Sequence, residues 1–173
     1  TFLQNYITRC FNAGKLARWL RMMGYDTLFF RDIEDGLLVD IAMREGRIVV
    51  TRDTQIAKRR VAANGCLRVI LSRDDDPREQ LRQVMTELKL DCHLKQFTRC
   101  IECNQVLTPR SKEEVKELVP PYVFRTQTQY MQCPSCLRVY WQGTHWQRMK
   151  KALEEVAADS RERSEYKTTA DTD

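Results

Sequence analysis

The sequence predicts an α/β fold, in which a parallel sheet is covered by flanking helices, followed by a smaller cysteine-rich module. Two observations support this prediction. Between residues 6 and 88, short β-type runs alternate four times with segments of helical periodicity, which is typical of a parallel sheet with crossover helices. After residue 90 the alternation ends and two Cys-x-x-Cys pairs follow. We therefore expect an α/β domain over residues 1–92, a second module over residues 93–149, and a helical end with a disordered tail over residues 150–173.

The four predicted strands are short runs rich in β-branched and aromatic residues, as strands generally are. They cover residues 6–10, 27–30, 47–51 and 67–71.

The predicted helices lie between these strands, where apolar residues recur at helical spacing. Three of them end at a glycine, the residue that most readily adopts the backbone conformation of a helix C-cap. The fourth begins at a proline, which suits the first helical turn. The helices cover residues 15–23, 35–45 and 53–64, ending at Gly24, Gly46 and Gly65, and the fourth begins at Pro77.

The second half of the chain contains one further helix signal. Ser111 and Glu114 have the spacing of a capping box, which predicts a helix over residues 111–118, closed by the two prolines that follow. Beyond Val156 the residues are dominated by charge, Ser and Thr, so a disordered tail is expected there.

The composition predicts a folded chain and excludes two classes of protein. Apolar residues make up 42% and charged residues 31%, which is enough hydrophobic material for a core and excludes wholesale disorder. No run approaches the roughly eighteen apolar residues of a membrane span. The N-terminus lacks the pattern of a secretion signal, so we expect a cytoplasmic protein that does not associate with membranes. The net charge of +5 is by itself weak evidence for a nucleic-acid partner.

Four of the seven cysteines have the spacing of a zinc ribbon. Cys100 and Cys103 form one pair, and Cys133 and Cys136 form the other. Each pair can present two sulfurs to one tetrahedral Zn²⁺ ion, and four thiolates leave no position for water, so the metal should be structural. Two redox-active pairs are the poorer alternative, because a redox motif belongs at the start of a helix after a strand.

Acidic residues follow the predicted strands, at the edge where parallel sheets bind ligands. Clustered carboxylates at such an edge favour a hard cation, and Mg²⁺ or Mn²⁺ there can activate water against a phosphodiester. The alternative is that Asp35 and Asp53 only cap helices, and the pattern alone favours it. The acids concerned are Asp35, Asp53, Asp75 and Asp76.

Cations lie close to these acids and in the cysteine-rich module, where they could hold the phosphates of RNA. For the third helix, an ordinary solvated face is an equal alternative. In the module, aromatic residues between cations could stack bases, but we favour a packing role for Trp141 and Trp146, and a local hydrogen bond for His145. The candidate RNA-binding residues are Arg52, Lys58, Arg59, Arg60, Arg73, Arg125, His145 and Arg148.

Four segments of the chain resemble one family, and they occur in the same order. They are GKLARWLRMMGYDT (14–27), EGRIVVTRD (45–53), SKEEVKELVPPYVF (111–124) and CPSCLRVYWQGTHWQRM (133–149). The resemblance is to the RNase family named for the C-terminal domain of the nematode exonuclease Mut-seven. It implies a PIN-like parallel sheet with flanking helices, a C-terminal zinc ribbon and cleavage of RNA, here expected to be single-stranded, with Mg²⁺ or Mn²⁺.

The resemblance also assigns roles to the acids, and it shows one departure. The family's acids match Asp35, Asp53 and either Asp75 or Asp76. The family usually ends its first strand with an aspartate where this chain has Cys10, a soft residue that Mg²⁺ does not prefer. A weakened enzyme, an inactive RNA- or protein-binding module, a site rebuilt around Asn12 and an engineered substitution are the open alternatives.

Overall fold

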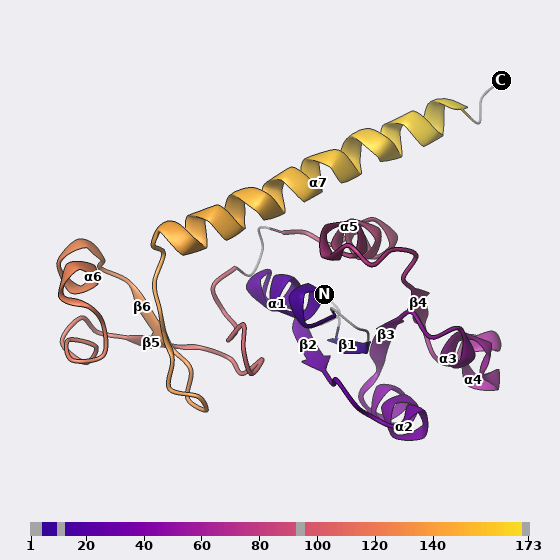
Figure 1. The fold of residues 1–173 in the computed structure, drawn as a ribbon, viewed down its shortest axis with the longest axis horizontal. Helices are drawn as coiled ribbons and strands as arrows, with labels where there is room; N and C mark the ends of the chain where they lie inside the picture. The colour runs from indigo at the N-terminus through magenta and orange to yellow at the C-terminus, as the bar shows by residue number, and fades with distance from the viewer. Residues whose placement is uncertain (1–4, 10–12, 93–95, 171–173) are drawn as a thin grey trace.

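The computed structural model describes residues 5–9, 13–92 and 96–170, and the side chains of residues 14–92 and 96–159. Its first half contains a four-stranded sheet of β1 (Asn5–Arg9), β2 (Asp26–Phe29), β3 (Arg47–Thr51) and β4 (Val69–Leu71). The strands are parallel and lie in the order β2-β1-β3-β4 (Figure 1). This confirms the predicted α/β fold with a parallel sheet, while its likeness to a PIN domain stays a prediction.

Each strand of this sheet is followed by one or two helices, as predicted for its alternating pattern. They are α1 (Ala13–Met22), α2 (Asp35–Glu45), α3 (Thr54–Lys58), α4 (Arg60–Ala63) and α5 (Pro77–Leu88). The glycines at 24, 46 and 65 have positive φ angles, which allow the chain to leave each helix.

The prediction of a single helix over residues 53–64 is wrong. Arg59 has an extended backbone, with φ −60° and ψ 145°, and it separates α3 from α4. Of the residues in these two short helices, only Ile56 is buried. We infer that little packing energy opposes the break, since helix stability in proteins comes mainly from a packed apolar face.

Strand β3 shows how the core is divided between the two faces of the sheet. All five of its residues are buried. Ile48 and Val50 pack with α1 and α5 on one face, and Val49 packs with α2 and α3 on the other. Successive side chains of a strand point to opposite faces, so a central strand covered on both faces has no exposed position.

The cysteine-rich half forms a second, antiparallel sheet of β5 (Thr108–Arg110), β6 (Tyr130–Gln132) and β7 (Val139–Tyr140), in that order. We call residues 96–143 the ribbon. The predicted boundary at residue 92 remains a prediction, but the two sheets are separate. Helix α6 (Pro121–Thr126) lies between β5 and β6.

The capping box is present, but the helix predicted after it is wrong. The backbone N–H of Ser111 donates to Oε2 of Glu114 at 2.7 Å, and the N–H of Glu114 donates to Oγ of Ser111 at 3.3 Å. The next residues form turns, and the helix begins only at Pro121. A segment this short is a marginal helix, and here Val115 and Val119 are instead buried against Tyr130.

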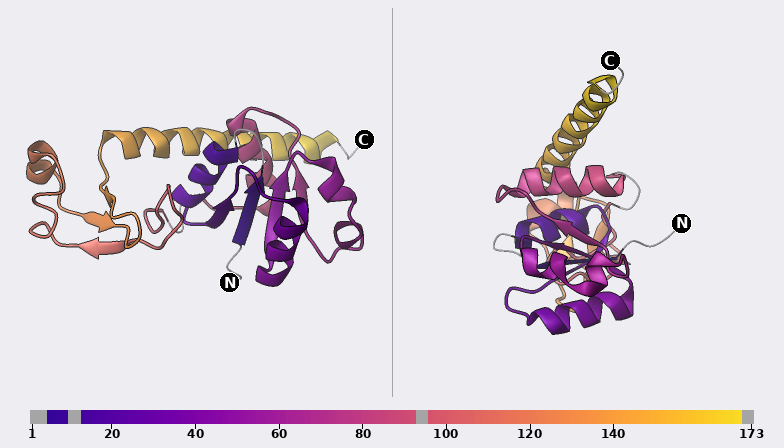
Figure 2. Two further views of the ribbon diagram at one scale, coloured as in Figure 1. Left: turned by 60° about the horizontal axis from the view of Figure 1, so that its bottom comes forward. Right: turned by 90° about the vertical axis from the view of Figure 1, so that its right-hand side faces the viewer.

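A long helix, α7 (Thr144–Ala170), follows the ribbon and runs back over the first half of the chain (Figures 1 and 2). The structure shows this helix in place of the disordered tail predicted beyond Val156. Leu153, Val156 and Ala157 are buried in the core cluster that includes α1 and α5. These apolar contacts anchor the helix, and the charged residues that follow include good helix formers. No helix of the described residues is long and apolar enough to cross a membrane.

The ribbon contacts the parallel sheet through the loop of its first cysteine pair. The guanidinium of Arg21, on α1, donates to the carbonyl oxygens of Thr27 (2.9 Å), Ile101 (3.0 Å) and Glu102 (2.8 Å). The side chain of Asn104 accepts from the N–H of Thr27 at 2.9 Å, so it satisfies a donor on the outer strand β2. The ribbon is therefore docked on the edge of the sheet.

A carboxylate anchors the same contact. Nδ2 of Asn104 donates to Asp26 at 2.8 Å, and Arg47 and Arg99 form ion pairs with Asp26 at 2.9 and 3.5 Å. Burial alone would raise the pKa of Asp26, but the hydrogen bonds from Arg47 and Asn104 outweigh it and hold the pKa below its usual value. Asp26 is therefore an ionised anchor between the sheet and the ribbon.

Candidate metal centres

The four predicted cysteine ligands lie together in the ribbon. The sulfurs of Cys100, Cys103, Cys133 and Cys136 are all within 4.8 Å of one another. Two of the separations are 3.6 Å (Cys100 to Cys136) and 3.3 Å (Cys103 to Cys133). Tetrahedral coordination with Zn–S bonds of about 2.3 Å places sulfurs roughly 3.8 Å apart, so the group is compact enough to hold one ion.

Both cysteine pairs are held by the same local structure. In the first, the N–H of Asn104 donates to the carbonyl of Cys100 at 2.9 Å, and in the second the N–H of Leu137 donates to the carbonyl of Cys133 at 3.0 Å. Asn104 and Leu137 each lie four residues after the first cysteine of a pair and have positive φ angles of 70° and 61°. These turns present both sulfurs of a pair on one side.

The pKa values of two cysteines in the cluster shift in opposite directions. Burial raises the pKa of Cys103 to about 12. Burial also opposes ionisation of Cys100, but hydrogen bonds, the largest from Tyr140, outweigh it and lower the pKa of Cys100 to about 7. The hydroxyl of Tyr140 lies 3.0 Å from Sγ of Cys100, where it can donate to a thiolate. Sequence spacing gave no sign of this contact, because the two residues are forty positions apart. These residues can hold a structural metal ion, and a tyrosine orients one of the ligands.

The predicted acids lie at the carboxyl edge of the parallel sheet, at the start of the helices that follow its strands. Asp53 is the N-cap of α3 and accepts from the N–H of Gln55 at 2.8 Å. Asp76 is the N-cap of α5 and accepts from the N–H groups of Arg78 (2.8 Å) and Glu79 (3.2 Å). The capping interpretation of Asp53 is thus confirmed.

For Asp35 the capping interpretation is wrong. Asp35 is the first residue of α2, and the N-cap is Glu34, whose side chain makes no cap hydrogen bond. A carboxylate in the first turn still benefits from the helix dipole.

Two of the predicted cations lie against these acids. Arg52 forms an ion pair with Asp75, and Arg59 forms one with Asp35 at 3.8 Å. Lys58, Arg60 and Arg73 are exposed. Among the described residues, the four cysteines are the one group of three or more metal-binding side chains that the structure brings together. The predicted acids share an edge but are not gathered around one point.

Two predicted positions cannot be placed. Cys10 and Asn12, which follow β1 in the sequence, lie outside the described residues. Predictions about them stay predictions.

The candidate RNA-binding residues of the second half are exposed. Arg125 is on α6, and His145 and Arg148 are on the first turns of α7. The packing role expected for the two tryptophans is confirmed in part. Trp146 contacts Phe97 edge to face, with ring centroids 4.9 Å apart, and Trp141 packs against the cluster around Tyr130.

Comparison with protein families gives a match to the family model of the Mut7-C RNAse domain over residues 10–153. The chain belongs to this family. The match to the Mut7-C RNAse domain spans β2, β3 and β4 of the parallel sheet, the ribbon and the start of α7, so the ribbon is part of the domain that the family defines. Neither the curated proteins nor the solved structures contain a match. As the family is one of RNases, RNA is the substrate class that membership suggests.

Proposed function

We propose that this Mut7-C domain hydrolyses phosphodiester bonds of RNA with a divalent cation held at the carboxyl edge of the parallel sheet, between β1 and β3. The observation that carries the proposal is the strand order β2-β1-β3-β4. The chain moves to one side of β1 to form β2 and then crosses to the other side to form β3. Ligands of open α/β sheets bind at such a switch point, outside the carboxyl ends of the strands. Asp53 follows β3 at that point.

The acids of this edge have the chemistry that the proposed ion requires. Asp35, Asp53 and one of Asp75 and Asp76 would supply oxygen ligands, which Mg²⁺ and Mn²⁺ prefer. The ion would activate a water molecule for attack on phosphorus and stabilise the charge that develops there.

The arginines that pair with these acids have a second role in the proposal. Arg52 and Arg59 offset the charge of Asp75 and Asp35 in the absence of an ion. A divalent cation would take over that task and leave the guanidinium groups to donate to phosphate oxygens, for which their geometry is well suited. The Cys100, Cys103, Cys133 and Cys136 cluster would hold structural Zn²⁺ and take no part in the chemistry.

Because Asp53 caps α3, a substitution can separate its structural role from a role in metal binding. Asn caps helices about as well as Asp, so Asp53→Asn removes the carboxylate charge and leaves α3 intact. We expect Mn²⁺-dependent cleavage of a mixed RNA pool to fall by about 100-fold or more, because the contribution of a catalytic ion is several kcal/mol. The comparison should use zinc-loaded protein with and without added Mg²⁺ or Mn²⁺, since a chelator would also strip the ribbon.

The matched control is Asp40→Asn, which makes the same chemical change at an exposed position within α2. This variant should cleave as the parent does. Equal activity of Asp53→Asn and the parent would show that Asp53 is only a cap.

The position after β1 provides a second test. If Cys10 stands where the family has an aspartate, then Cys10→Asp adds an oxygen ligand and should raise Mg²⁺-dependent activity. A loss of activity in Cys10→Asp, together with efficient cleavage by the parent, would contradict that assignment.

A second candidate function is an inactive RNA- or protein-binding module. It is favoured by the carboxylates of Asp53 and Asp76, which are already used as helix caps, and by the pairing of Asp35 and Asp75 with arginines. The two functions differ in their metal requirement. The enzyme needs Mg²⁺ or Mn²⁺ in addition to zinc, whereas the binding module needs the structural ion alone.

The proposed path of RNA past the sheet edge can be tested by charge reversal. Replacing Lys58, Arg59 and Arg60 with Glu should weaken binding of all RNA sequences alike, since phosphates carry no base identity. Parental affinity should fall with rising salt, by about 0.7 per phosphate contact in a log–log plot for single strands. If the triple variant binds like the parent while Arg125→Glu and Arg148→Glu reduce binding, RNA follows the ribbon instead.

A further inference from the structure

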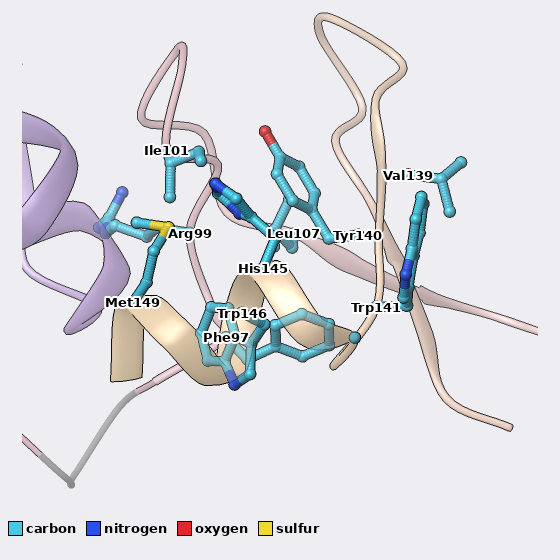
Figure 3. Close-up of a pocket in the computed structure, with 11 residues that line it drawn as sticks. Phe97, Arg99, Ile101, Leu107, Val139, Tyr140, Trp141, His145, Trp146 and Met149 are labelled. Carbon is cyan, nitrogen blue, oxygen red and sulfur yellow. The ribbon is translucent and has the colours of Figure 1, made fainter. Parts of the chain in front are cut away.

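A pocket of about 260 Å³ lies between the ribbon and the first turns of α7. It belongs to neither of the metal centres described above. Figure 3 shows three aromatic walls around this space: Tyr140, Trp141, and the pair formed by Phe97 and Trp146. The rest of the lining is largely aliphatic. A pocket with flat aromatic walls is suited to a planar, partly apolar ligand.

The aromatic walls are held in place by contacts with neighbouring residues. The edge-to-face contact with Phe97, at an interplanar angle of 71°, holds Trp146. The hydroxyl of Tyr140 lies against Cys100, so this wall is tied to the metal cluster. A Cβ atom on Gly143 would lie 2.7 Å from Nε1 of Trp141, so the turn before α7 approaches the indole as closely as glycine alone allows. Rigid walls lower the entropy that a ligand loses on binding.

The lining of the pocket carries hydrogen-bond donors and no carboxylate. Among the eleven described residues that line it, none is acidic, and four side chains carry nitrogen donors: Arg99, Trp141, His145 and Trp146. Arg99 is held by its hydrogen bond to the carbonyl of Asn104 at 2.8 Å and by its ion pair with Asp26 at 3.5 Å, which offsets its charge. His145 is exposed and lies in the first turn of α7, where backbone N–H groups and the helix dipole attract phosphate. An aromatic pocket beside such a helix end matches a base joined to a phosphate.

We propose that this pocket binds one unpaired nucleobase of a single-stranded RNA, with the adjoining phosphate near His145 and the start of α7. The proposal rests on the proposed function for its ligand class, and it adds a base-binding site away from the acids at the sheet edge. Proteins that bind single strands stack unpaired bases on aromatic side chains in this way. The ribbon thereby holds the RNA by its bases, while the sheet edge acts on its phosphates.

The first test leaves the protein unchanged. Fluorescein-labelled 2′-O-methyl oligoribonucleotides of eight residues are titrated with zinc-loaded protein, without Mg²⁺ or Mn²⁺, and binding is followed by fluorescence anisotropy. A second set carries abasic sugars in place of all bases. Stacking of one base changes affinity by roughly 5- to 150-fold, so the abasic strand should bind that much more weakly. Equal affinity of the two strands would overturn the proposal.

The second test uses variants of the pocket to determine whether the base-dependent affinity comes from this site. We expect His145→Ala and Trp146→Leu to weaken binding of the strand with bases, and Trp146→Leu to leave binding of the abasic strand unchanged. Tyr122→Ala is the matched control, because Tyr122 is an aromatic residue of the ribbon, 68% exposed, that does not line the pocket. His145 is exposed, so its replacement keeps the test valid if Trp146→Leu fails to fold.

The outcomes separate this proposal from the proposed nuclease function. Suppose that binding depends on the bases and is lost in the pocket variants, but that the protein shows no Mn²⁺-dependent cleavage. This result supports the base-binding pocket and rejects the nuclease function. Cleavage that persists while base removal and pocket variants have no effect rejects the pocket alone. Binding of an apolar peptide or metabolite by the pocket, with no response to RNA, also overturns the proposal.

Discussion

Arg21 should hold the ribbon against the parallel sheet, and its replacement tests how much stability this contact contributes. Arg21 is 7% exposed, and its side chain donates to three carbonyl oxygens, one on β2 and two in the loop after Cys100. A hydrogen bond from a charged donor contributes about 1.5–3 kcal/mol. Because water can reach part of the space left by the side chain, we expect Arg21→Ala to lower the free energy of unfolding by about 3–5 kcal/mol.

Substitution by lysine separates charge from geometry. In the parent, Nε of Arg21 donates to the carbonyl of Thr27, and Nη1 donates to the carbonyls of Ile101 and Glu102. Arg21→Lys keeps the charge, but its single nitrogen, Nζ, cannot reach both positions. We therefore expect a loss of at least one bond, or about 1.5–3 kcal/mol.

The neighbouring Arg18 provides a control, because its replacement should cost less stability than that of Arg21. It is on the same helix and forms an ion pair with Glu102 at 2.9 Å, but its side chain is 55% exposed. Exposed ion pairs contribute at most about 1 kcal/mol. Urea denaturation of zinc-loaded protein, followed by circular dichroism, measures each change. Equal losses in Arg18→Ala and Arg21→Ala, or a loss below about 1 kcal/mol in Arg21→Ala, would refute the reasoning.

Three further predictions concern the metal, acid and glycine positions. Elemental analysis should find one zinc per chain. Cys103→Ser should lose the metal and, with it, the roughly 10 kcal/mol that a zinc site contributes to folding. The control Cys66→Ser, at an exposed cysteine outside the cluster, should keep both. The pKa of Asp26 is held below its usual value, so the stability that its ionised carboxylate provides is present above about pH 4 and is lost as the pH falls through the folded-state pKa. Asp26→Asn should therefore make the free energy of unfolding depend less on pH in the acid range. Gly143→Ala should displace the indole of Trp141, at a cost of about 1–3 kcal/mol, with a shift of the indole N–H resonance in NMR spectra.

Each of these has an outcome that would contradict it. If the metal-free ribbon unfolded as cooperatively as the parent, the metal would not be needed for the fold. An unchanged pH dependence in the acid range in Asp26→Asn would mean that other carboxylates govern acid stability. Parental stability of Gly143→Ala would show that the turn can move away from Trp141 without cost.

The order of strands and helices in the first half could be predicted from the sequence, because it depends on local pattern. Helix α2 and strand β3 have the predicted bounds, and α5 begins at the predicted proline. At these positions the period of apolar residues, the glycine at the helix end and the proline at the helix start agree with one another. The cysteine spacing likewise predicted a cluster that the structure brings together.

Predictions failed where a local signal had to compete with packing elsewhere in the chain. The capping box at Ser111 forms, but burial of Val115 against Tyr130 keeps the following residues in turns. The charged segment predicted to be disordered continues as helix, because Leu153, Val156 and Ala157 at its start pack into a core built by α1 and α5. Both outcomes depend on residues far away in the sequence.

By itself, the sequence determined the alternation of strands and helices in the first half, the family, the four clustered cysteines and the set of acids after the strands, since these depend on residue type and spacing. Only the tertiary structure decided which atoms meet. It placed Tyr140 beside Cys100, joined the ribbon to the sheet through Arg21 and Asn104, and formed the aromatic pocket at the start of α7. Spacing along the chain carries no information about such contacts, because each joins side chains that come together only when the two sheets and α7 pack.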